Sequence, residues 1–185
     1  AYLRLSRSDF NTSHVAKLRN NIIKFIVPLC KSLYAQRKER LHLNTLYYYD
    51  QIHFPEGNPK PKGSSEHLIK MAQKMYRSIA PESGLFFDKM VNEGLLDLVN
   101  RDKKMAGGFC TSFAKYKRPF IFSNFNGTDH DITVLTHEAG HAFQYFCSRN
   151  QPLLEYNWPT MESAEIHSMS MEFLTWPWMD LFFKE

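Results

Sequence analysis

The stretch DHDITVLTHEAGHAFQYFCSR, from Asp129 to Arg149, decides how the rest of the chain is interpreted. A turn with the sequence Asn126-Gly127-Thr128 precedes it, and Thr128 or Asp131 is a plausible N-cap. Its apolar residues recur at helical spacing: Ile132, Leu135, Ala139, Ala142, Phe143 and Phe146. We therefore predict a helix that ends at about Arg149.

This helix carries an H-E-x-x-H motif, His137-Glu138-Ala139-Gly140-His141. Residues four apart project from one helix face, so the two imidazoles can bind a single Zn²⁺. Glu138, one step round the helix, reaches a water on the metal rather than the metal itself. The alternative is two exposed histidines beside a surface glutamate, which an apolar helix disfavours because buried polar groups need partners. We predict one zinc ion, with His137 and His141 as ligands and Glu138 as the general base.

A catalytic zinc ion takes three protein ligands and leaves one position open. We expect the third ligand on a helix from Met161 to about Leu174, where Glu162, Glu165 and Glu172 share one face at spacings of three and seven. A His₂Glu site is therefore favoured over His₃. Glu165 is central among small neighbours and is preferred, and Glu162 is the next candidate. The remaining candidates are Glu155, His167 and Glu172.

Upstream, the chain predicts further helices and a little β structure. Residues 1–43 read mostly as one long helix, with a kink or a break at Pro28, and residues 44–63 as an irregular connection. Within residues 64–128 we predict helices from Ser64 or Ser65 and from about Leu85 to Val99, with a turn at Pro81–Gly84. Two aromatic, β-branched runs then predict a hairpin or two edge strands, Phe109–Phe113 and Pro119–Ser123. With residues 129–175 as zinc-site helices, we predict one mainly helical catalytic domain over residues 1–185.

Bulk composition excludes several classes of function. The 185 residues are 43% hydrophobic and 23% charged, as in ordinary globular proteins. The net charge of +4 is dispersed, which argues against nucleic-acid binding, and no apolar run reaches the length of a membrane span. Three distant cysteines without a C-x-x-C pair favour a reducing compartment, the cytoplasm. No pattern favours a particular oligomeric state.

Several segments together resemble the oligoendopeptidase F and Pz-peptidase branch of the thimet oligopeptidase family. Pro119–Thr128, followed by Asp131 and then the zinc motif, is similar to that family's strand, turn and zinc helix. Thr160–Glu165, followed by Ser168 and Glu172, is similar to the helix that carries its glutamate ligand. Glu93–Asp97 and Gly107–Cys110 resemble its lead-in to the active-site strand. The resemblance covers roughly residues 40–175.

The resemblance implies a zincin-like helical core, with the zinc helices at the floor of a deep channel that admits short peptides but not folded proteins. It places the glutamate ligand on Glu165. The family's substrate-polarising Tyr and His lie beyond the segment present in this chain. The chain also lacks an initiator Met and stops within a helical pattern. We therefore expect a fragment that holds the metal and the base but not the whole catalytic apparatus.

The predicted activity is zinc-dependent hydrolysis of short peptides by an oligoendopeptidase. A noncatalytic zinc-binding or peptide-binding module and a zinc hydrolase of another small amide are the alternatives. Candidates for accepting a hydrogen bond from the other ring nitrogen of a ligand histidine are Asp131, Glu162 and Glu172, although a simple N-cap role is favoured for Asp131. Substrate-binding candidates are Gly107, Gly108 and Phe109, at the start of a strand whose edge could pair with an extended peptide.

Overall fold

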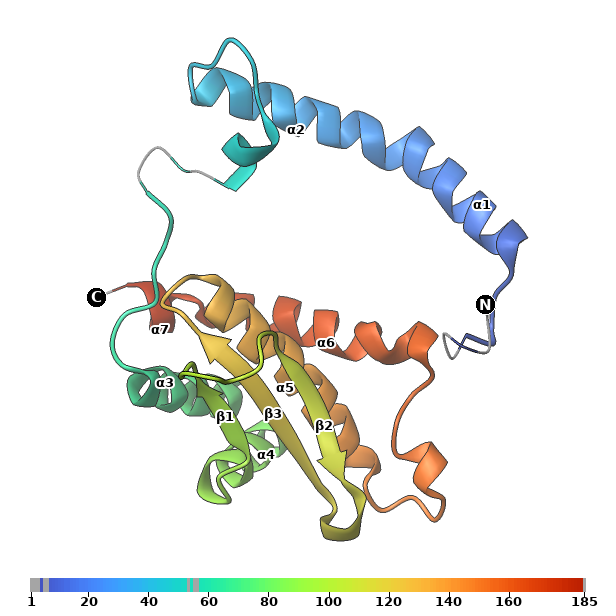
Figure 1. Cartoon of the computed structure of the whole chain (residues 1–185), viewed down its shortest axis with the longest axis vertical. Helices are drawn as coiled ribbons and strands as arrows, with labels where there is room; N and C mark the ends of the chain where they lie inside the picture. The colour runs from blue at the N-terminus through green and yellow to red at the C-terminus, as the bar shows by residue number, and fades with distance from the viewer. Residues whose placement is uncertain (1–3, 5–6, 53, 55–56, 185) are drawn as a thin grey trace. The chain divides into compact units, whose positions relative to one another are not determined.

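The computed structural model describes residues 4, 7–52, 54 and 57–184, and it divides into two compact units. The first is Ala1–Asn58 and the second is Pro59–Glu185. The fold is mainly helical with a small sheet (Figure 1), as the sequence predicts. Within the described residues, no helix is both long enough and apolar enough to cross a membrane.

The first unit begins with helix α1, Thr12–Asn21. Asn11 is its N-cap and forms a capping box with His14: the Asn11 side chain accepts from the His14 backbone N–H, and the His14 ring accepts from the Asn11 N–H. These bonds satisfy donors that the first helical turn leaves without partners. The side chain of Asn11 thus fixes the start of α1.

The helix continues through a π-helical stretch, Ile22–Ile26, into α2, Val27–Arg40. The π-helical stretch lies directly before Pro28, whose ring would clash with the carbonyl of Lys24 in a regular helix. A wider i→i+5 turn accommodates a side chain or ring inserted into the helical ladder. The predicted kink at Pro28 therefore takes the form of a π-bulge in an otherwise continuous helix.

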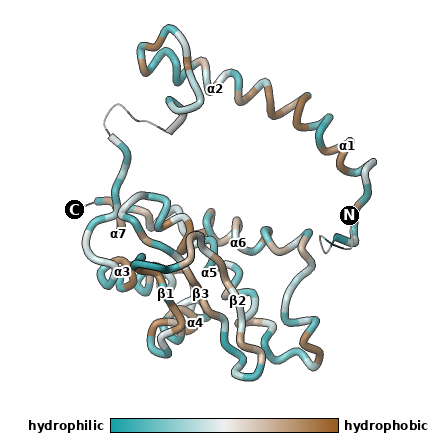
Figure 2. The backbone as a smooth tube through the Cα atoms, in the orientation of Figure 1, coloured by the Kyte–Doolittle hydropathy of each residue, from teal (hydrophilic) through white to brown (hydrophobic). Residues whose placement is uncertain are grey.

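Apolar residues on α1 and α2 are not covered within the first unit. Figure 2 shows hydrophobic segments recurring along these helices. The exposed apolar side chains include Val15, Leu18, Ile22, Ile23, Phe25, Ile26, Leu29 and Leu33.

A short 3₁₀ helix, Tyr48–Ile52, follows in the predicted irregular connection. His53, Pro55 and Glu56 of that connection lie outside the described residues.

The second unit begins with two helices, α3 (Ser65–Ile79) and α4 (Pro81–Asn92). Ser64 caps α3 through its side chain, as predicted. The predicted turn at Pro81–Gly84 is wrong, because proline is favoured at the first position of a helix and Pro81 opens α4. α4 ends before Gly94, which has a left-handed φ of +66°. The predicted helix to Val99 is therefore wrong in its second half.

The residues beyond Gly94 form a strand that the sequence analysis missed. β1 (Leu96–Val99) lies parallel to β3 (Arg118–Phe125), and β2 (Phe109–Phe113) lies antiparallel on its other side, in the order β1-β3-β2. The predicted pairing of the two later strands is confirmed. The sequence of β1 was predicted as helix because a run of four mostly apolar residues fits both the helical period and the alternation of a strand. β2 is an edge strand of this sheet.

Two long helices, α5 (His130–Ser148) and α6 (Met161–Thr175), pack against each other, and α5 also packs on β2 and β3. Both helices lie close to their predicted limits. A short helix, α7 (Asp180–Phe183), follows α6. The core is largely apolar and aromatic, and its fully buried side chains include Met75, Tyr76, Phe86, Phe87, Ile121, Ile132, Leu135 and Phe182.

Candidate metal centre

Three potential ligand atoms meet between α5 and α6. His137 and His141 project from α5 with their rings 5.0 Å apart, and Glu165 faces them from α6. Glu165 Oε2 lies 3.1 Å from His137 Nε2 and 3.7 Å from His141 Nε2. All three donor atoms lie within 4.8 Å of one another. Of the glutamates that share the predicted face of α6, the structure brings Glu165 to the two histidines.

These separations suit a small tetrahedral cation. Zinc binds imidazole nitrogen and carboxylate oxygen at about 2.0–2.2 Å, so two such ligands on one tetrahedral ion lie about 3.3–3.5 Å apart. The distances of 3.1 and 3.7 Å from Glu165 bracket that value. The Glu165 side chain is 58% exposed, so the group is open to solvent on one side. A structural zinc site is instead closed by four protein ligands.

Glu172 completes the environment of His137. Its Oε1 lies 2.7 Å from His137 Nδ1, so Nδ1–H donates to the carboxylate. This contact favours the tautomer in which Nε2 carries a lone pair. In that tautomer the lone pairs of Nε2 and Glu165 Oε2 face each other across 3.1 Å, an arrangement that a cation bound between them would stabilise. The donor set thus fits a metal ion.

Glycine at position 140 lets the two helices approach closely enough for this grouping. A Cβ on Gly140 would lie 2.6 Å from both His167 O and Ser168 Cα, and 2.9 Å from Met171 Cβ. Ordinary contacts begin at about 3.4 Å. Because two of the three neighbours are backbone atoms of α6, any larger residue would force the helices apart. The second variable position of the H-E-x-x-H motif is therefore constrained by packing.

Ser168, which the sequence analysis did not assign to the site, orients the Glu165 side chain. It is fully buried, and its hydroxyl donates to Glu165 Oε2 at 2.8 Å and to the Glu165 carbonyl at 3.1 Å. Two signals could have identified it: its position one turn after Glu165, and its place in the segment that resembles the family's glutamate helix. The Glu165 carboxylate is thus held from its own helix before any metal binds.

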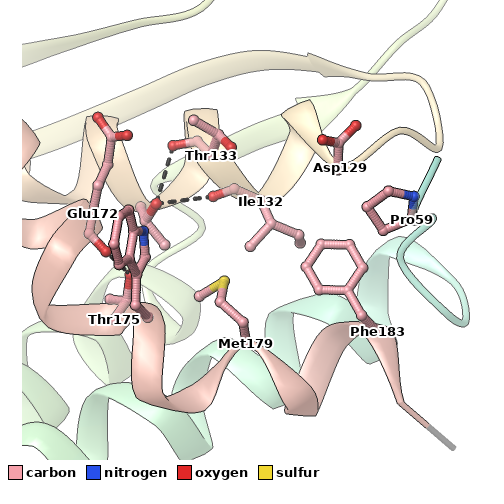
Figure 3. A pocket seen from close by; sticks show the side chains of 10 residues that line it. Pro59, Asp129, Ile132, Thr133, Glu172, Thr175, Met179 and Phe183 are labelled. Atoms are coloured by element: carbon pink, nitrogen blue, oxygen red, sulfur yellow. Dashed lines mark hydrogen bonds between the residues drawn. The ribbon is translucent and has the colours of Figure 1, made fainter. Parts of the chain in front are cut away.

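Glu172 also belongs to the wall of a neighbouring cavity of about 190 Å³ (Figure 3). Ile132, Met179 and Phe183 supply apolar side chains to this cavity, and Thr175 donates to the Glu172 carbonyl at 2.7 Å. This hydrogen bond stabilises the backbone of α6 at Glu172, the residue that accepts from His137. Glu172 therefore lies between the metal group and this cavity.

Glu138 lies beside the three donors and is 8% exposed. Burial raises the pKa of its carboxyl group above the ordinary value, while the backbone N–H of Cys110 on β2 opposes that shift by hydrogen bonding to the carboxylate. A Cβ on Gly108 would lie 3.9 Å from Glu138 Oε1. The start of β2 therefore lies against the carboxylate. Burial, together with the negative charge of Glu138, also raises the pKa of the Cys110 thiol.

The other predicted site residues have different surroundings. Asp131 is neither the N-cap, which is Asp129, nor hydrogen bonded to His137 or His141 in the described contacts. Its buried carboxylate instead accepts from the backbone N–H groups of Asn126 and Gly127, because the chain is already helical at Asp129. Glu162 is not part of the three-donor group.

The substrate-binding candidates lie at one end of the sheet. Gly107 and Gly108 line a cavity of about 270 Å³, together with Asn124 and Val134. Phe109 is 38% exposed and stacks on Phe122 with ring centroids 4.9 Å apart. The structure therefore places two of the three candidates in a cavity wall next to Glu138, and the third on the face of the sheet.

Comparison with known proteins supports a single family. The chain is 29% identical over 175 residues to an oligoendopeptidase F homolog of Borreliella burgdorferi, which covers 88% of this chain and 28% of that protein. It matches a structure of PZ peptidase A with an inhibitor (54% identity, TM-score 0.93, 99% of this chain and 33% of the other).

A crystal structure of a putative oligoendopeptidase F from Bacillus anthracis also matches, with 50% identity and a TM-score of 0.93 over 99% of this chain and 34% of the other. The chain thus spans about a third or less of the length of these relatives. The family model for peptidase family M3 matches residues 1–184. The chain belongs to peptidase family M3.

Proposed function

We propose that this chain carries the zinc centre of a metalloendopeptidase that hydrolyses short peptides. The observation that carries the proposal is the grouping of two imidazole nitrogens and one carboxylate oxygen within 4.8 Å, beside a second, buried carboxylate, that of Glu138. His137, His141 and Glu165 would hold one Zn²⁺. When bound, the ion supplies Lewis-acid polarisation of the scissile carbonyl and lowers the pKa of water towards 7.

Glu138 performs the proton transfers. Its carboxylate accepts a proton from the attacking water and returns it to the leaving amine. The raised pKa of its carboxyl group makes the protonated form easier to reach, which suits a group that must hold a proton between these two steps. The Cys110 N–H hydrogen bond fixes the carboxylate while it does so.

The edge of β2 supports an extended peptide as the substrate. β2 ends the sheet on one side, so its outer backbone groups can pair with a substrate chain. Gly107, where an added Cβ would meet no atom within 4 Å, leaves room for close backbone approach one residue before Gly108, which lies against Glu138. The names of the relatives, oligoendopeptidase F and PZ peptidase, agree with a peptide substrate. We extend their preference for oligopeptides to this chain as part of the proposal.

Glu138→Gln tests the role of the base in the complete protein. The variant should bind zinc as the wild type does but lose hydrolysis of a quenched fluorescent peptide, by at least about 100-fold for loss of a general base. Glu155→Gln is the matched control, because Glu155 is exposed on a 3₁₀ helix away from the donor group and should retain activity.

Chelation tests the role of the metal. Hydrolysis should stop when a chelator removes zinc and return when zinc is restored. Hydrolysis that persists without metal would overturn the enzyme proposal. Zinc binding with no hydrolysis of any peptide would favour the alternative of a noncatalytic zinc-binding module, and loss of zinc from Glu138→Gln would make Glu138 a ligand.

A further inference from the structure

The connection between β1 and β2, residues 100–108, leads directly to the backbone that touches Glu138. It contains two left-handed residues, Lys103 (φ +63°) and Gly107 (φ +102°). A left-handed conformation is disfavoured for a non-glycine residue, so other contacts must hold Lys103 in place. The connection therefore depends on tethers to the rest of the sheet.

Lys104 provides the first tether. Its side chain is only 1% exposed, and its Nζ donates to the carbonyls of Asp97 (3.0 Å) and Val99 (2.9 Å) on β1 and of Ser123 (2.5 Å) on β3. Asp97 Oδ1 lies 3.0 Å away and balances the charge. These carbonyls converge where the β1–β3 register shifts between Asp97 and Val99. A buried ammonium thus closes the irregular end of the parallel ladder.

The same ammonium contacts the first residue of β2 through an intervening ring. Nζ lies 4.4 Å from the ring centroid of Phe122, and Phe109 stacks on Phe122 with an interplanar angle of 14°. A cation over an aromatic face is attracted to it, and most strongly away from water. Lys104 therefore stabilises both ends of the segment that runs from residue 104 to Phe109.

Asn124 of β3 provides the second tether. Its Nδ2 donates to the carbonyls of Met105 (2.9 Å) and Gly107 (2.8 Å). Its Oδ1 is buried without a hydrogen-bond partner in the described part of the chain, which is unfavourable. The two hydrogen bonds that Nδ2 donates therefore hold the Asn124 side-chain amide in this orientation. Both donors act on the segment that enters β2.

Beyond these tethers the segment reaches the candidate site. Gly107 and Gly108 form part of the wall of the 270 Å³ cavity, which Asn124 also lines, and Cys110 donates its backbone N–H to Glu138. A Cβ on Gly108 would lie 2.9 Å from Val134 Cγ1, so the strand lies directly on α5. A small displacement of this segment would alter both the cavity and the environment of Glu138.

We propose that Lys104 and Asn124 are positioning residues that hold residues 105–110 against α5, so that the peptide-binding edge of β2 and the Cys110 amide are in place before substrate binds. This inference rests on the proposed function of the same site. Neither side chain touches the donor atoms for zinc. Their removal should therefore affect peptide binding much more than metal binding.

Hydrogen–deuterium exchange of the full chain tests the tethers without reference to activity. In Lys104→Met and in Asn124→Ala, the amides of residues 105–110 should exchange at least about tenfold faster, because local opening loses hydrogen bonds to a charged or amide donor. Arg101→Met is the matched control: Arg101 also pairs with Asp97, but its side chain is 59% exposed and touches no carbonyl of the segment in the described contacts. Its exchange should match the wild type.

Kinetics and zinc affinity test the positioning role. Against a quenched short peptide, both variants should lower kcat/KM at least about tenfold, mainly by raising KM, while zinc affinity stays within about twofold of the wild type. Lys104→Arg keeps the charge and should restore part of the loss. Arg101→Met should have wild-type kinetics.

Unchanged exchange, faster exchange with an unchanged KM, or an equal effect of Arg101→Met would each overturn the inference. If Lys104→Met does not fold, Lys104→Arg and Asn124→Ala decide the question by the same measurements. A wild-type protein without metal-dependent hydrolysis would instead overturn the proposed function. The exchange data would then still report whether the two residues hold the segment.

Discussion

Replacing Gly140 with Ala sets helix propensity against helix packing. In an exposed helix interior, Gly→Ala stabilises by about 1 kcal/mol. Here the added Cβ would lie 2.6 Å from His167 O and Ser168 Cα, so α5 and α6 must separate by about 0.8 Å to reach 3.4 Å. Overpacking of this kind costs about 1–3 kcal/mol. We expect the free energy of unfolding to fall by about 0–2 kcal/mol. A change of that size would not by itself show that the two helices meet at Gly140.

Metal affinity is the sharper measurement. Ligand distances in a metal site hold to about 0.2 Å, and Glu165 is on the helix that must move. A shift of about 0.8 Å is four times that tolerance. Loss of a residue that hydrogen bonds to a metal ligand weakens metal binding by about 10–100-fold, so displacement of a ligand itself should weaken it at least as much. We expect zinc affinity, measured by competition with a chromophoric chelator, to fall at least about 100-fold.

Two controls separate packing from other effects. Thr133→Ala changes an exposed residue of the same helix and should leave zinc affinity unchanged. Adding Met171→Ala to Gly140→Ala should not restore zinc binding, because the two shortest contacts are to backbone atoms. Wild-type zinc affinity in Gly140→Ala would refute the reasoning, since either the helices would not meet at this residue or Glu165 would not be a ligand.

Three further predictions concern groups around the site. Glu172→Ala removes the partner of His137 Nδ1 and should weaken zinc binding by about 10–100-fold in the same competition assay, whereas Glu172→Gln, which keeps an acceptor, should lose less. Asp131→Ala leaves the turn N–H groups of Asn126 and Gly127 without their carboxylate and should lower the free energy of unfolding in urea by about 1–3 kcal/mol; an unchanged midpoint would contradict this. The hydrogen bond from Arg101, with help from Lys104, lowers the pKa of Asp97 from 3.8 to about 2, so the stability it contributes is complete above about pH 4 and is lost as the pH falls towards 2. Asp97→Asn should flatten the pH dependence of the melting temperature over that interval, and a curve parallel to the wild type would rule out this contribution.

Local sequence signals predicted the helices and the chemical character of the site. The spacing of His137, Glu138 and His141 has meaning only on a helix, and the apolar period around it identifies one. The predicted α6 likewise shows which acidic side chains share a face. By contrast, Leu96–Val99 was misread because a four-residue apolar run has no distinguishing period, and pairing with β3 decides its conformation. The opening of α4 at Pro81 was misread because a proline that ends one helix can also begin the next.

The sequence by itself determined which residue types are present in the H-E-x-x-H motif and that its two histidines share a helix face, because helical spacing is a local property of the chain. Only the tertiary structure decided which glutamate of α6 meets them, since that choice depends on the approach of two helices at Gly140. It also decided that Glu172 holds His137, that Asp131 secures a turn, and that Lys104 and Asn124 secure the segment beside Glu138. Apart from the Asp131 contact, which spans four or five residues, each of these contacts joins residues far apart along the chain, so no period or spacing encodes it.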